Sequence, residues 1–173
     1  LLTRTNASGA RVAGLNMEAK VGYGHLLTFQ AGYPYNHSRY IEPLQWSENP
    51  NIIPQNRMFR TPDPYGYFLC NVEPFKNFHI VTNGQVTGSM LVQHFAGFVP
   101  EDEEVKTPVF FEWDLKLCYD IPLYKHYTLE INAGVKNILD NFQHDIDQGM
   151  NRAAGYVYGP ATPSTVFPGI NLK

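Results

Sequence analysis

Residues 112–136, with the sequence EWDLKLCYDIPLYKHYTLEINAGVK, contain two stretches in which apolar and polar residues alternate. In the first, 112–121, Trp113 and Leu115 lie between charged residues, and in the second, 127–136, Ile131 lies between Glu130 and Asn132. Because successive side chains of a strand point to opposite faces, each stretch predicts a strand with one apolar and one polar face. Each stretch is about ten residues long, whereas strands of globular proteins usually have about 5–6. The length matches the roughly 9–11 residues that a tilted strand needs to cross a bilayer.

Composition excludes several classes of protein. The chain has 173 residues and a net charge of −3, without a cluster of Lys and Arg, which argues against a nucleic-acid partner. The two cysteines, Cys70 and Cys118, are too few for a disulfide scaffold and lack the spacing of a zinc site. The sequence contains no run of eighteen apolar residues, so it predicts no transmembrane helix. The chain begins with Leu1 rather than methionine, so we expect it to lie within a longer polypeptide.

The rest of the chain extends this pattern to seven strands in one domain, 1–173, of the all-β class. The expected strands cover residues 9–20, 25–36, 64–72, 78–92, 112–121, 127–136 and 165–173. Short connections at 20–25, 73–77 and 122–126 alternate with long ones at 37–63, 95–109 and 139–164. In an antiparallel up-and-down arrangement, all short connections lie at one end and all long ones at the other. Transmembrane β-barrels of outer membranes show the same asymmetry.

Aromatic residues gather near both ends of the expected strands, as in the girdles of membrane barrels. The group near the short turns comprises Tyr23, Phe75, Phe78, Tyr119, Tyr124 and Tyr127, and the group near the long connections comprises Tyr33, Tyr35, Phe95, Phe110 and Phe111. Alternation alone leaves open which face is inside, because a soluble ligand-binding barrel would turn its apolar face inward. The three long connections at one end favour the membrane arrangement.

Residues 133–173 resemble the C-terminal end of TonB-dependent outer-membrane receptors. The similarity lies in a strand end of the form GVKNILD, Gly134 to Asp140, and in a final strand close to YxYGPxxPRTxFxGI. Matching positions in that strand include Tyr156, Tyr158 and Phe167, whereas Ser164 replaces the usual arginine. The terminal Leu172-Lys173 also departs from the aromatic residue that outer-membrane barrels commonly carry at the end.

The resemblance implies that the chain is the C-terminal part of a transmembrane barrel of about 22 strands. It implies an N-terminal plug, which has no counterpart in this sequence, and a location in the bacterial outer membrane. The implied activity is import of a scarce nutrient such as a ferric siderophore, haem, cobalamin or a glycan, driven through TonB. Implied partners are outer-membrane lipid, the remainder of the barrel with its plug, TonB and a surface lipoprotein. The remaining interpretations are a soluble ligand-binding barrel and an outer-membrane enzyme.

Candidate site residues lie mainly in the long connections. Arginines with nearby aromatic or histidine side chains suggest substrate contacts, and these are Tyr40, Trp46, Arg57, Arg60, His94, Arg152 and Tyr156. A denser cluster of carboxylates, Asp140, Asp145 and Asp147, is a weak candidate for a hard cation such as calcium, although it lacks the EF-hand register. The acidic run 101–104 is typical of a solvated loop tip. No catalytic motif is present, so we expect neither enzymatic activity nor a cofactor.

Overall fold

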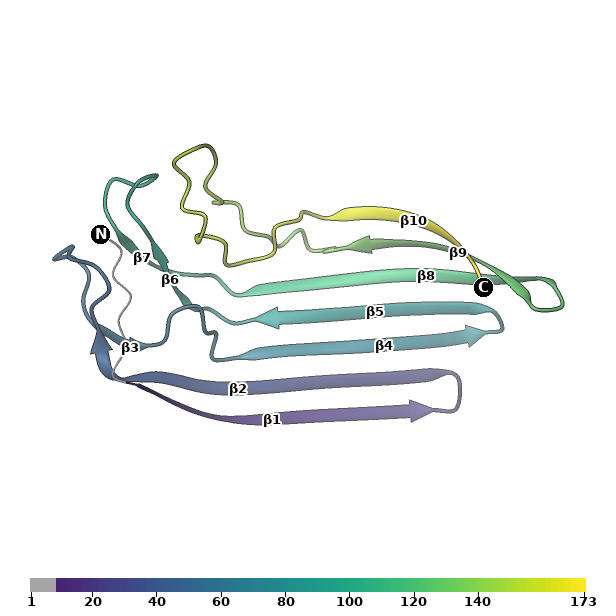
Figure 1. The fold of residues 1–173 in the computed structure, drawn as a ribbon. Helices are drawn as coiled ribbons and strands as arrows, with labels where there is room; N and C mark the ends of the chain where they lie inside the picture. The colour runs from purple at the N-terminus through teal and green to yellow at the C-terminus, as the bar shows by residue number, and fades with distance from the viewer. Residues whose placement is uncertain (1–8) are drawn as a thin grey trace.

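Long strands dominate the fold of this protein. The computed structural model describes residues 9–173 and contains ten strands (Figure 1). The seven long ones are β1 (Ala10–Tyr23), β2 (Leu27–Leu44), β4 (Tyr65–Phe75), β5 (Phe78–Thr87), β8 (Phe110–Tyr124), β9 (Tyr127–Lys136) and β10 (Thr165–Leu172). The three short ones are β3 (Gln55–Arg57), β6 (Leu91–His94) and β7 (Glu103–Lys106). Residues 9–173 include no helix that is long and apolar enough to cross a membrane.

The seven long strands form one antiparallel up-and-down sheet in the order β1-β2-β4-β5-β8-β9-β10. This confirms the predicted class and connectivity. The turns after β1, β4 and β8 lie together at one end, and the three long connections gather at the other (Figure 1). The tight turn between β4 and β5 places Asn77 at a φ of 67°, a conformation that asparagine tolerates better than most residues. The turn between β4 and β5 is therefore only two residues long.

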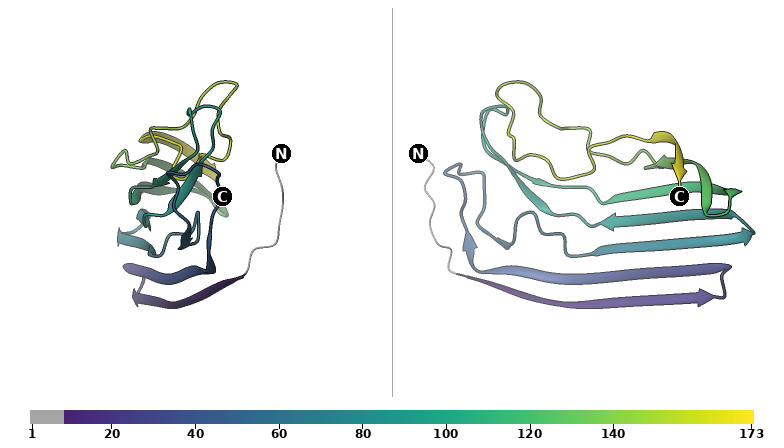
Figure 2. Two further views of the ribbon diagram at one scale, coloured as in Figure 1. Left: turned by 90° about the vertical axis from the view of Figure 1, so that its left-hand side faces the viewer. Right: turned by 45° about the vertical axis from the view of Figure 1, so that its right-hand side comes forward.

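The sheet is curved and open. Seen along its strands, it bends from β1 toward β10 without meeting itself (Figure 2). Among residues 9–173, no strand pairs with the outer edge of β1 or of β10. An unpaired edge exposes a row of backbone donors and acceptors, which favours pairing with further strands.

Two parts of the fold differ from the sequence prediction. The expected strand 78–92 is broken, because β5 ends at Thr87 and β6 begins at Leu91 in a separate two-stranded sheet with β7. The break occurs at Gly88, whose N–H donates to the Pro64 carbonyl in a contact too close for a side chain. The second strand extends to Leu44, beyond the predicted end at residue 36, because its far half pairs with β1 and β3.

Glycines within the sheet are covered by aromatic rings from the neighbouring strand. The Tyr67 ring lies over Gly32 on one face, and the Phe68 ring lies over Gly84 on the other, in each case where a Cβ atom would clash. A ring in this position protects the backbone that glycine leaves uncovered and fixes the register. Strands β2, β4 and β5 are thereby locked together on both faces.

Candidate functional site

The two faces of the sheet differ in chemistry and in exposure. Cross-strand partners share a face, so the register assigns Leu117 and Ile131 to one face and Glu130 and Asn132 to the other. The apolar Leu117 and Ile131 are 40% and 45% exposed. The polar Glu130 and Asn132 are only 7% and 5% exposed. In β8 and β9 the apolar face is therefore the open one, and the polar face is covered, whereas the edge strand β1 is exposed on both faces.

This arrangement is the reverse of a water-soluble sheet. Among the described residues, the buried hydrophobic side chains are Ile52, Met90, Val92, Phe110, Cys118 and Tyr156. Only Phe110 and Cys118 belong to the seven long strands, and both lie on the polar face. The sheet consequently has no apolar core of its own on either face.

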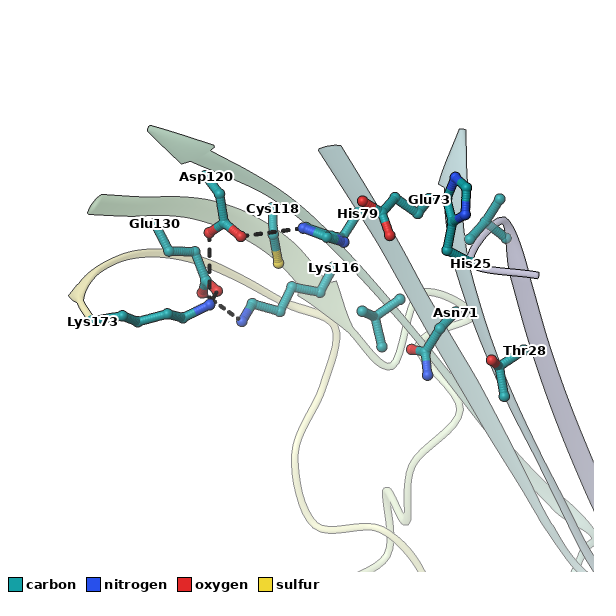
Figure 3. Close-up of a pocket in the computed structure, with 12 residues that line it drawn as sticks. His25, Thr28, Asn71, Glu73, His79, Lys116, Cys118, Asp120, Glu130 and Lys173 are labelled. Carbon is teal, nitrogen blue, oxygen red and sulfur yellow. Dashed lines mark hydrogen bonds and ion pairs between the residues drawn. The ribbon is translucent and has the colours of Figure 1, made fainter. Parts of the chain in front are cut away.

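An ion-pair network occupies the polar face near the short turns (Figure 3). Glu130 accepts hydrogen bonds from Lys173 and, at 3.3 Å, from Lys116. Lys173 also lies 3.6 Å from Asp120, whose second oxygen is 3.2 Å from Nε2 of His79. Charges from β8, β9 and the residue after β10 are thus mutually paired, which is what a covered carboxylate such as Glu130 requires, and His79 of β5 adds a hydrogen-bonding partner.

The network lines one side of a pocket of about 360 Å³. Its other side is formed by residues of β2, β4 and β5 together with the first turn, namely His25, Thr28, Asn71, Glu73 and Val81. Donors, acceptors and both signs of charge are present, so the pocket suits a wet or polar occupant. Sequence analysis did not single out His79, Asp120 or Lys173 as site residues. The sequence signal that could have identified them is their place on the polar side of the alternating strands.

Aromatic side chains mark the edges of the apolar face. At the short-turn end, Tyr23, Tyr124 and Tyr127 are exposed, and Phe78 stacks on Phe75 with ring centroids 4.8 Å apart. Tyr119 is also exposed and pairs with Phe78 across β5 and β8. These aromatic side chains therefore lie along the short-turn edge of the apolar face, and whether they form a girdle stays a prediction.

At the long-loop end the prediction needs one correction. Tyr33 and Tyr35 are exposed on the apolar face, as expected. Phe110 lies on the opposite face and is buried, because Gly159 and Tyr158 of the last connection cover its ring. It does not belong to an outward aromatic girdle.

A compact core lies among the long connections, and it contains two predicted substrate contacts. Val92 is fully buried with Met90 and Tyr156. The ring of His94 stacks on Tyr156 with centroids 3.7 Å apart, and its Nε2 lies 2.8 Å from Asp147. His94 and Tyr156 are both buried. Their observed role is therefore to hold residues 139–164 against the β6–β7 hairpin.

The other predicted contact residues are dispersed around this core. Arg57 pairs with Asp63, and Arg60 donates to the carbonyls of Gly155 and Val157. Trp46 packs edge-on against Phe59 and Phe95. Tyr40 lies on β2, where its carbonyl accepts from Asn56, and Arg152 is exposed in the last connection. The structure brings His94 and Tyr156 together but does not gather the whole set around one cavity.

The three predicted cation ligands have separate hydrogen-bond partners. Asp140 accepts from the N–H of Ser164, and Asp147 accepts from His94 and from the N–H of Ala153. Asp145 accepts from the hydroxyls of Tyr156 and Tyr158. Within residues 9–173, no group of three His, Cys, Asp or Glu side chains has the geometry to hold a metal ion.

Asp145, Tyr156 and Tyr158 form a hydrogen-bonded polar cluster within the last connection. Burial alone would raise the pKa of Asp145, but the hydroxyls of Tyr158 and Tyr156 hold this pKa below its usual value. Burial and the adjacent carboxylate raise the pKa of Tyr158 to about 12 and raise that of Tyr156 as well. The hydroxyls therefore remain protonated donors at neutral pH.

No protein-family model matches the chain, and no curated protein matches it.

Proposed function

We propose that the seven long strands are part of a transmembrane β-barrel in a bacterial outer membrane. The observation that carries this proposal is the exposed apolar face opposite a covered polar face. In lipid the exposed side chains have an apolar solvent, and the polar face lines a wet interior. The two open edges fit the same proposal, because lipid tolerates a sheet only when it is closed by further strands.

Two further features support this placement. The seven long strands have 8–18 residues, a range that includes the length needed to cross a bilayer at a tilt. Short turns lie at one end and long connections at the other, which is the arrangement of outer-membrane barrels. A soluble ligand-binding barrel is the rival proposal, and it would turn the apolar face inward, whereas the covered Glu130 and the pocket lie on the polar face.

The sequence resemblance supports a specific assignment within this class. We propose that the parent protein is a TonB-dependent receptor that imports a scarce nutrient, with ferric siderophores, haem, cobalamin and glycans as the candidate substrates. The packed long connections would form the outward-facing mouth, and the polar face would line the passage. Transport would draw its energy from TonB, as the resemblance implies.

Orientation in the membrane can be tested with Trp113, which lies on the exposed apolar face. The complete protein is placed in vesicles with or without brominated acyl chains, and the quenched fluorescence is compared between the parent and Trp113→Phe. We expect brominated lipid to quench the Trp113 contribution. Trp46→Phe, at the long-loop end, is the matched control. It should leave the difference in fluorescence between brominated and ordinary vesicles almost unchanged. A monodisperse complete protein in buffer without detergent, with Trp113 unquenched, would favour the soluble barrel.

Transport requires a separate test. A strain lacking the complete gene is grown with single sources of iron, cobalamin or glycan at limiting concentration, with and without functional TonB. We expect a growth defect on one source, restored by the gene only when TonB is functional. Restoration that is independent of TonB would contradict the energy source that we propose.

A further inference from the structure

An arginine cluster lies on the outward face of the sheet beyond its apolar part. Going along β1 and β2 toward the long-loop end, the register pairs Leu15 with Tyr35 and then Arg11 with Arg39. Arg39 is also paired with Arg57 of β3. Cross-strand partners share a face, and Arg39 and Tyr35 occupy alternate positions, so the three arginines lie on the same side as the exposed apolar residues.

The cluster has an excess of positive charge. A single carboxylate, Asp63, lies between Arg39 and Arg57, at 3.1 Å and 3.3 Å from their guanidinium nitrogens. Although burial alone would raise the pKa of Asp63, the hydrogen bond and charge of Arg39 and the charge of Arg57 hold it below its usual value. Arg11 is exposed and forms no ion pair with any residue in 9–173. Two guanidinium groups thus share one carboxylate, and Arg11, the cross-strand partner of Arg39, adds a third positive charge beside them.

The height of the cluster places it at a membrane boundary. Arg11 lies about 14 Å along the strand from Leu15, at about 3.4 Å per residue, which is roughly 10 Å in height for a strand tilted by about 45°. The apolar side chains between Tyr23 and Leu15 span about 27 Å along β1 at the same rise, or roughly 20 Å in height. Arg11 and its neighbours therefore fall beyond the aromatic edge of the apolar band, at headgroup level.

We propose that Arg11, Arg39 and Arg57 form a binding site for the phosphate of a lipid headgroup in the leaflet at the long-loop end. This inference rests on the proposed transmembrane placement. Guanidinium groups bind phosphate through paired N–H donors, and they are less strongly hydrated than ammonium groups. A phosphate at this position would neutralise the charge left over after Asp63 is paired, and would hold the first hairpin of the sheet at a fixed depth.

The test uses the complete protein in detergent, titrated with phosphatidic acid or with phosphatidylcholine, and counts retained lipids by native mass spectrometry. We expect phosphatidic acid to be retained preferentially. Arg11→Gln, which leaves the Arg39–Asp63 pair intact, should weaken this retention about threefold, and Arg11→Gln with Arg39→Gln about tenfold or more. Lys125→Gln, in the turn at the opposite end, is the matched control and should have no effect.

Several outcomes would overturn the inference. One is an equal loss of phosphatidylcholine in the arginine variants, which would indicate general loosening of the hairpin. Another is displacement of phosphatidic acid by millimolar inorganic phosphate, which would indicate a site for the free ion. If brominated lipid leaves Trp113 unquenched, the membrane placement and this inference both fail. If Trp113 is quenched but lipid retention ignores the arginines, only the inference fails.

Discussion

The sheet and the long-loop end of this molecule differ in where they bury large apolar side chains. In the sheet, the carboxylate of Glu130 is covered while Leu117 and Ile131 are open. Among the long connections, Val92 is fully buried with Met90 and Tyr156, and the acidic residues Glu101 and Glu103 are exposed. The two regions belong to one chain and are joined by continuous strands. We propose that lipid surrounds the sheet and water surrounds the long connections.

The difference explains how each region is held together. The long-loop end follows the ordinary rule of water-soluble proteins, in which apolar contacts and satisfied polar groups are inside. In the sheet, backbone pairing between long strands and the ion pairs of the polar face provide the order. We propose that lipid contacts the exposed apolar side chains of the sheet.

A charge on the apolar face should have the largest effect. Leu117→Arg is expected to destabilise the complete protein in a bilayer by about 2–4 kcal/mol if Leu117 lies near the midplane. If the same face met water, an exposed substitution of this kind would change stability by only about 0.5 kcal/mol. The measurement is a urea unfolding titration in lipid vesicles. Lys20→Arg, at an exposed position on the polar side of β1, is the control and should change little.

A cavity in the loop core should have a smaller and local effect. Val92→Ala removes two methyl groups from a fully buried site and should cost about 1–3 kcal/mol of local stability. Hydrogen exchange should rise in residues 90–94 and 153–158 and stay unchanged in the sheet. Val157→Ala, at an exposed position of the same connection, serves as the control. Faster exchange throughout the sheet would show that the two regions are one cooperative unit.

The smallest effect is the pH dependence of stability that comes from Asp145, Tyr156 and Tyr158. The pKa of Asp145 is below its ordinary value of 3.8, so its stabilising contribution is present above that pH and is lost as the pH falls further. The pKa of Tyr158 rises from 10.0 to about 12, so its contribution is complete below pH 10 and is lost as the pH approaches 12. Tyrosinate absorbance, taken as the difference between the parent and Tyr158→Phe, should show a midpoint near 12. A midpoint near 10 would mean that the hydroxyl is not held by Asp145.

Strands were predictable where alternation is regular and long. The strand 127–136 was predicted with the bounds that β9 has, and the order of the seven long strands followed from alternating short and long connections. The break at Gly88 was missed because its cause is a contact with Pro64, which is distant in sequence. The short strands β3 and β7 were missed because three or four residues carry no measurable periodicity.

The candidate site was less predictable for the same reason. His94 and Tyr156 have the chemistry of ligand-binding residues, but Asp147 and the hairpin bury them. The arginine cluster depends on the pairing of β1 with β2 and of β2 with β3, which no local pattern reveals. By contrast, the polar position of Glu130 on its face followed directly from alternation.

A spin-label scan along β8 tests the central claim most directly. Single cysteines replace each of the residues 113–121 in turn in the complete protein, with Cys70 and Cys118 otherwise changed to serine, and are labelled in lipid vesicles. We expect collisions with oxygen, which concentrates in lipid, to peak at Trp113, Leu115 and Leu117, and collisions with a water-soluble nickel chelate to peak at the alternate positions. Contact of the chelate with Leu115 and Leu117, with no oxygen maximum there, would contradict the account.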